Sequence, residues 1–135
     1  MRASTQPILL RRITAVTAAE AIPALANFIS LTRSQWNLAA AAIPNLAFYQ
    51  RATVRFGIPT LGGTVTACTI QLLGATPDTA VGPLSLGTSA LTAGAFPEFS
   101  FDLTQLTLFP RVLSITGTTP AVTVDVWFQA FNPSD

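Results

Sequence analysis

Near the C-terminus, the sequence LSITGTTPAVTVDVWFQAF (residues 113–131) alternates between two kinds of side chain in its last third. One set is apolar and the other is polar or aromatic: Val122, Val124, Val126 and Phe128 against Thr123, Asp125, Trp127 and Gln129. A period of two residues is typical of a β-strand with one buried face. The pattern therefore predicts a strand on which Trp127 points away from the core.

The neighbouring segments predict more strands with turns between them. RVLSIT (111–116) and GTTP (117–120) predict a hairpin that closes on the strand starting at residue 121. FYQRATVRF (48–56) alternates an apolar face with a basic face, GIPTLGG (57–63) is typical of a turn, and TVTACTIQLL (64–73) predicts the next strand. Residues 74–94 have the Gly, Pro and Ser content of a long connection or of a loop with one short strand, and EFSFDL (98–103) predicts a further strand.

Short strands with frequent turn signals and no long helix between them are typical of an all-β fold. We expect an antiparallel β-sandwich, jelly-roll-like, over residues 47–135. Residues 1–46 are rich in Ala with scattered Pro, and they predict an extended, partly irregular N-terminal arm with short strands and one helical turn. The whole chain is expected to be a single domain, because 135 residues is an ordinary domain length.

The chain is poor in charge. It has seven Arg and six acidic residues, and it has no Lys and no His. Charged residues are therefore 10% of the chain, against about 25% in ordinary soluble domains. A folded monomer of this mass exposes on the order of 7,000 Å², so much of that surface must be apolar or small and polar, which favours burial against other protein. The alternative is a soluble monomer rich in surface Ser, Thr and Ala. The near-neutral balance argues against nucleic-acid binding.

The residue types that common catalysis needs are missing. Without His and Lys the chain lacks the usual general base, Schiff-base former and imidazole ligand. Cys68 has no His to activate it, and its position on a strand predicts a small buried side chain. Glu98 and Asp102 lie four residues apart on one strand, too far for a glycosidase pair. We therefore expect no enzyme activity, no cofactor and no metal site.

No membrane partner is expected either. The longest apolar stretch, residues 36–49, is shorter than the roughly 20 residues that a helical span needs.

Several aromatic and basic side chains are candidates for a protein interface. Trp127 at the outward phase, Tyr49 and Arg51 on the face opposite the core, and Trp36 in an apolar segment are of the types enriched at interface centres. The alternative is that the N-terminal arm of the same chain covers these faces. Both interpretations bury Trp127 and differ in whose chain covers it.

The second half of the chain resembles the small β-sandwich virion proteins of tailed bacteriophages, which include head decoration (cement) and tail-associated subunits. The resemblance covers residues 64–131. It rests on a Gln-Leu-Leu-Gly loop with a Thr-Pro-Asp turn (71–78), a Leu-Thr-Ala-Gly segment (91–94), a Phe-Asp-Leu strand (101–103), an Arg-Val strand (from 111) and the run Thr-Gly-Thr-Thr-Pro-Ala-Val-Thr-Val (116–124).

The resemblance implies a structural role in the virion, which is assembled in the host cytoplasm. We expect a capsid decoration subunit that forms a homo-oligomer, with a trimer favoured, and that binds the major capsid protein or another virion protein. Residues 1–12 would be an extended arm whose Arg2, Arg11 and Arg12 meet carboxylates of the shell or of a neighbour.

Two other functions stay open. The chain could be a tail or neck subunit that packs into a ring. From a different class, it could be a carbohydrate-binding module whose exposed Trp127, Tyr49 or Trp36 stacks on sugar rings. In the sequence only Asp125 and Gln129 flank Trp127 as polar partners for a sugar.

Overall fold

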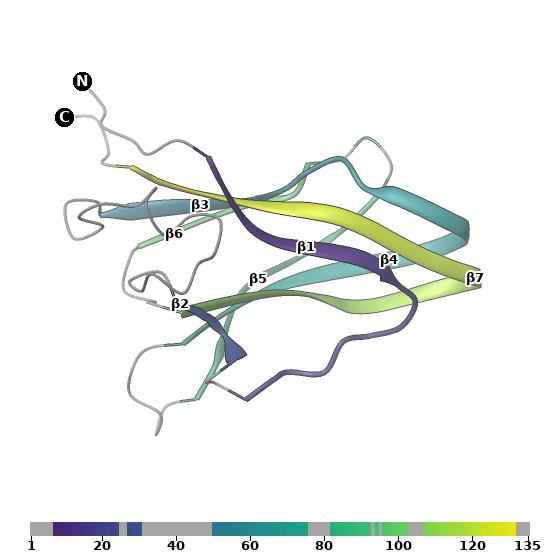
Figure 1. Cartoon of the computed structure of the whole chain (residues 1–135), viewed down its shortest axis with the longest axis horizontal. Helices are drawn as coiled ribbons and strands as arrows, with labels where there is room; N and C mark the ends of the chain where they lie inside the picture. Colours follow the sequence, from purple (N-terminus) through teal and green to yellow (C-terminus); the bar gives the residue numbers. More distant parts are fainter. Residues whose placement is uncertain are drawn as a thin grey trace.

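The computed structural model describes residues 7–24, 27–30, 50–75, 82–92, 94, 96–102 and 107–131. Within these residues the chain forms seven strands, all of whose pairings are antiparallel (Figure 1). They are β1 (Ile8–Val16), β2 (Ile29–Ser30), β3 (Arg51–Phe56), β4 (Thr60–Ala75), β5 (Leu84–Ala90), β6 (Glu98–Asp102) and β7 (Thr107–Phe131).

The long strand β7 organises the sheet. One of its edges pairs with β4 over residues 107–123 and then with β3 over residues 126–131. Its other edge pairs with β2 at residues 107–108 and with β1 over residues 122–128. Outside these, β5 pairs with β4, and β6 pairs with β3. Among the described strands, β1, β2, β3 and β4 thus pair with β7 directly, and β5 and β6 are each separated from it by one strand.

The sheet folds over on itself at the middle of β4 and β7. Figure 1 shows both strands running out to the right-hand end of the molecule and returning. Gly63 lies there with a φ of 62° and Gly117 with a φ of 144°, and the register shifts between Gly62 and Thr64. A Cβ at Gly63 would overlap the carbonyl oxygen of Thr119, and one at Gly117 would overlap that of Thr64. Both positions therefore need glycine, because the two backbones approach closely at the bend.

The two halves of the folded sheet enclose the core. One layer contains β1, β3, β6, the second half of β7 and the start of β4 that pairs with it, and the other contains β2, β5, the first half of β7 and the rest of β4. Inward side chains from both layers form one buried cluster that includes Ile13, Val54, Phe56, Ile70, Leu72, Val112, Val124, Val126 and Phe128. On the far side the Phe99 ring of β6 lies over Gly87 of β5, so the sheet is nearly closed into a barrel.

The all-β, antiparallel prediction is confirmed. The described strands form one continuous sheet that curls, rather than two separately paired sheets, so the sandwich of jelly-roll type stays a prediction. Trp127 does lie on the outer face, next to buried Val126 and Phe128.

The hairpin predicted around residues 117–120 is wrong. These residues lie inside β7, and their partners belong to β4: Val65 pairs with Gly117, and Leu61 pairs with Val122. The Gly-Thr-Thr-Pro signal marks a bend in a continuous strand, with Thr119 also at positive φ. The turn predicted over residues 57–63 is shorter than expected, because β4 already begins at Thr60.

Part of the predicted arm is a strand of the sheet. In β1 the side chains of Ile8, Leu10 and Ile13 are buried. A register shift between Leu9 and Arg11 moves the alternation by one residue, so that Ile13 rather than Arg12 faces the core. Residues 1–6, 25–26 and 31–46 of the predicted arm lie outside the described residues.

The bend makes a prediction about neighbouring glycines. Gly63→Ala should lower the free energy of unfolding by about 2–4 kcal/mol. The alanine would have to keep a left-handed backbone conformation, and its Cβ would displace the Thr119 carbonyl, so two costs are added. Gly62→Ala is the matched control, since its Cβ would meet Ala121 Cβ at an ordinary 3.5 Å. Urea unfolding of both variants measures the difference, and equal stabilities would contradict the close approach at Gly63.

Candidate functional site

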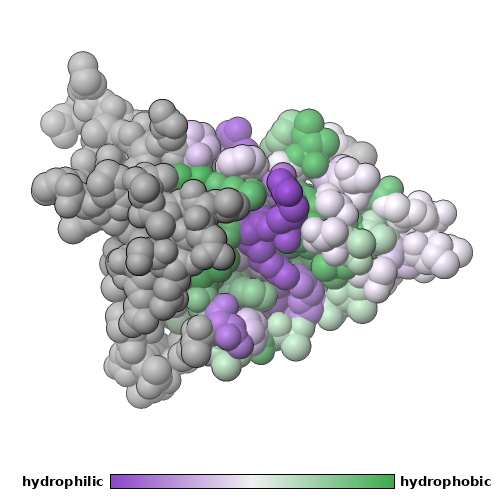
Figure 2. Space-filling model, in the orientation of Figure 1, coloured by the Kyte–Doolittle hydropathy of each residue, from purple (hydrophilic) through white to green (hydrophobic). Residues whose placement is uncertain are grey.

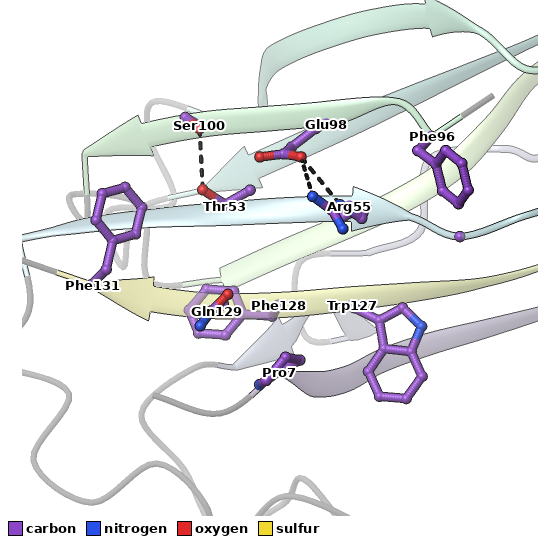
Figure 3. A pocket seen from close by; sticks show the side chains of 11 residues that line it. Pro7, Thr53, Arg55, Phe96, Glu98, Ser100, Trp127, Phe128, Gln129 and Phe131 are labelled. Carbon is purple, nitrogen blue, oxygen red and sulfur yellow. Dashed lines mark hydrogen bonds and ion pairs between the residues drawn. The ribbon is translucent and has the colours of Figure 1, made fainter. Parts of the chain in front are cut away.

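Outward side chains of β3, β6 and β7 line a groove on the sheet surface. Its cavity volume is about 610 Å³, within the range of small-molecule sites. The strands contribute Thr53, Arg55, Glu98, Ser100, Trp127, Gln129 and Phe131. The groove exists because alternate residues of three adjacent strands face the same side of the sheet (Figure 3).

Polar pairs join β3 to β6 along this face. Arg55 donates from Nε and Nη2 to Glu98 Oε2 at 3.1 and 2.8 Å. Two residues along, the hydroxyls of Thr53 and Ser100 lie 3.1 Å apart. Arg51 is paired with Asp102, two residues further on. The basic face predicted for residues 48–56 is therefore neutralised by acidic residues of β6.

Two aromatic side chains stand at one end of the groove. Trp127 is 37% exposed, and Phe96, just before β6, is 52% exposed. Figure 3 shows both on the same side of the Arg55–Glu98 pair. The indole nitrogen lies beside Gly57, which follows β3, since a Cβ built at Gly57 would be 3.9 Å from Trp127 Nε1. Ile58 lies next to Gly57 in the sequence and is 65% exposed. This end of the groove is thus apolar, and the floor beside it is polar.

A second cluster fastens the segment after β1 to the first half of β7. Glu20 Oε1 accepts from Arg11 Nη1 at 3.0 Å and from the Val112 amide at 2.9 Å. Arg11 also donates to the Pro110 carbonyl and lies over the Phe109 ring. Because Arg11 belongs to one layer and Val112 to the other, this cluster ties the two layers together at the β1 edge.

The same cluster sets the pKa of Glu20. Partial burial raises this pKa, but the hydrogen bonds from Arg11 and Val112 and the charges of Arg11 and Arg111 lower it by more, so it lies below its ordinary value of 4.5. Arg111 donates to the Glu20 carbonyl and to Gln71 Oε1. The charged cluster is therefore structural and stays ionised at neutral pH.

Every charged side chain among the described residues has a partner in the same chain. The four carboxylates pair with four arginines: Glu20 with Arg11, Asp125 with Arg12, Asp102 with Arg51 and Glu98 with Arg55. The fifth arginine, Arg111, is held by its two hydrogen bonds. In the view of Figure 2 the hydrophilic residues gather in a narrow band bordered by neutral and hydrophobic ones.

The predicted interface residues fall in three places. Trp127 and Arg51 lie on the outer face of one layer, although only Trp127 lines the groove. Arg11 and Arg12, expected to meet carboxylates of a neighbour, pair with Glu20 and Asp125 of their own chain. Arg2, Trp36 and Tyr49 lie outside the described residues.

The sequence reasoning missed Arg55, Glu98 and Phe96 as neighbours of Trp127. A signal was present in the alternation of basic residues in β3 and acidic residues in β6, which match position by position once the register is known.

Other candidate chemistry has plain positions. Cys68 is buried, and burial raises the pKa of its thiol. Within the described ranges, no three His, Cys, Asp or Glu side chains are grouped as metal ligands would be. The described part of the chain also has no helix that is long and apolar enough to cross a membrane.

Comparisons with known proteins place the chain in no family. No protein-family model and none of the curated proteins matches it. Among solved structures it is similar to the crystal structure of the SPBc2 prophage-derived protein YomS, with a TM-score of 0.46 and 12% sequence identity over 98% of this chain and 96% of that chain. A likeness of this degree assigns neither a family nor a role.

Glu20 predicts a specific pH dependence of stability. Glu20→Gln should lower the free energy of unfolding at neutral pH by about 1–3 kcal/mol, because Arg11 loses its partly buried partner. The native pKa of Glu20 is lowered, so its contribution is present above pH 4.5 and is lost as the pH falls through the native pKa. The difference between wild type and variant in urea unfolding should therefore narrow below pH 4.5. A constant difference would contradict the ion pair, and the exposed pair of Asp102 supplies a control, since Asp102→Asn should change little.

Adjacent aromatic residues of β7 should differ in their contribution to stability. Phe128 is fully buried, so Phe128→Ala should cost about 3–5 kcal/mol. Trp127→Ala should cost at most half as much, because the indole is partly exposed on the outer face. Thermal unfolding of both variants measures this, and equal losses would place Trp127 in the core.

Proposed function

We propose that this protein is a non-enzymatic structural subunit of a tailed-bacteriophage virion, most specifically a capsid decoration (cement) subunit. The phage assignment is supported by the sequence motifs of residues 64–131, of which residues 71–74 and 117–120 lie within β4 and β7 rather than in turns. The structural role is supported by one observation above all: the described surface has its charges paired within the chain, beside several exposed apolar side chains. Such a surface suits contact with other protein more than free solution.

Contacts of this kind stabilise a shell by addition over many copies. Burying apolar surface contributes roughly 25 cal/mol per Å² before the costs of association are subtracted. Ile22 and Leu84 are exposed, do not line the groove and would supply such area. In this proposal they contact the major capsid protein or another virion protein, or a further copy of the chain in a homo-oligomer such as a trimer.

In this proposal, the arginines expected at the interface contact the partner differently from what the sequence predicts. Arg11, Arg12 and Arg51 have carboxylate partners in their own chain, so they would contribute to an interface through their side-chain stems or by exchanging partners. Arg2, Trp36 and Tyr49 keep their predicted interface role. We keep the jelly-roll-like sandwich as part of the same proposal, since two layers face each other across the core.

Copy number and particle association test the role. We expect the protein to copurify with phage heads at a copy number comparable with that of the major capsid protein. A copy number that matches a single ring would favour the tail or neck alternative instead. On the isolated chain, light scattering should report a homo-oligomer. A protein that is absent from particles and stays monomeric at high concentration would contradict the proposal.

A further inference from the structure

We propose that the groove on β3, β6 and β7 is a binding site for a neutral saccharide, with a sugar ring stacked on Trp127 and its hydroxyl groups bonded to the Arg55–Glu98 pair. This inference concerns a surface separate from the subunit contacts proposed above. It assigns Trp127 to a ligand rather than to a neighbouring subunit.

The aromatic end of the groove suits the apolar face of a sugar ring. Trp127 and Phe96 keep about a third and a half of their surface exposed, at the same end of a cavity of about 610 Å³. A partly exposed aromatic ring offers a flat apolar area next to polar groups. Sugar rings present C–H groups on one side and hydroxyl groups at the rim, so they match this combination.

The polar floor has hydrogen-bonding capacity left over. Both bonds between Arg55 and Glu98 converge on Glu98 Oε2. Among the described residues nothing bonds to Glu98 Oε1 or Arg55 Nη1, so Glu98 can accept a further bond at Oε1 and Arg55 can donate one from Nη1. The indole N–H of Trp127 likewise has no acceptor within the described part of the chain. An acceptor and two donors around an aromatic ring suit a ligand with adjacent hydroxyl groups.

The charge balance favours a neutral ligand. Among the described residues that line the groove, the only ionised groups are Arg55 and Glu98, and they compensate each other. An acidic sugar would meet the Glu98 carboxylate, and a basic ligand would meet the Arg55 guanidinium. Asp125, beside Trp127 in the sequence, is engaged by Arg12. The charged partners of the ligand therefore come from β3 and β6, and β7 adds the indole N–H of Trp127.

The position of the groove favours a saccharide over a peptide strand. Its floor is the face of the sheet, where the main-chain groups of β3 are bonded to β6 on one side and to β7 on the other. An extended peptide recognised by strand addition needs a free strand edge. Recognition in this groove has to use side chains, and stacking together with hydroxyl bonding is the mode that its side chains offer.

A glycan array probed with the full-length chain tests the site. The array carries neutral oligosaccharides of hexose and N-acetylhexosamine units beside sialylated and sulfated ones. We expect binding to one or more neutral members. In calorimetric titration with the best of them, Trp127→Ala and Glu98→Gln should each weaken the affinity by about tenfold or more. The affinity of Trp127→Phe should lie between those of the wild type and Trp127→Ala, because phenylalanine keeps an aromatic face and lacks the N–H donor.

Matched controls separate this site from the proposed virion contacts. Asp102 lies on β6 like Glu98 and is paired with Arg51 of β3, but it does not line the groove. Asp102→Asn should therefore leave glycan affinity unchanged. Leu84→Ala should weaken particle incorporation and leave glycan binding intact, whereas Trp127→Ala should do the reverse. Circular dichroism and thermal unfolding verify that each variant is folded.

Three results would overturn the proposal. The first is a folded wild-type chain that binds no neutral member of the array, and the second is binding restricted to acidic glycans. The third is an affinity that Trp127→Ala leaves unchanged. Any of these would leave the virion role untouched, because that role is measured by particle copy number.

Discussion

The long strand β7 pairs with β4 around a shared bend and then with β3, and the other strands are positioned by these pairings. One edge of β7 pairs first with β4 and then with β3, and the other edge pairs with β2 and β1. Because Gly63 and Gly117 let the two backbones approach at the bend, a single sheet can fold over and bury both of its halves against each other. The Arg11–Glu20 pair then ties the layers at the edge where β1 lies.

The parts of this fold that could be predicted are those that depend on local alternation. The period of two in residues 122–128 is enough to place Val124 and Phe128 inside and Trp127 outside, because adjacent side chains of a strand face opposite ways. The predicted hairpin is wrong because the sequence Gly-Thr-Thr-Pro is compatible with both a tight turn and a bend in a continuous strand. Only the pairing with β4 decides between the two. Arg55 and Glu98 are neighbours through a register that joins residues 43 positions apart, which no local pattern reveals.

The electrostatic arrangement connects the fold to its proposed use. The chain has few charged side chains, and the carboxylates of the described part are all paired with arginines. Some pairs join neighbouring strands, as between β3 and β6, and the pair at Glu20 joins the two layers. The pairs fix register and orientation, and they leave the outer surface without a strong net field. What remains for recognition is apolar area and the unused donor and acceptor atoms of compensated ion pairs, which in our proposals serve protein contacts at Leu84 and a neutral ligand beside Trp127.

Cross-strand nuclear Overhauser contacts in the isotopically labelled protein report which strand lies beside each part of β7. The bent sheet predicts contacts from Leu61 to Val122 and from Cys68 to Ile115, together with contacts from Arg55 to both Trp127 and Glu98. Contacts between Ile115 and Val122 as partners in a hairpin, with none from either residue to β4, would contradict the bent sheet and the groove that it builds.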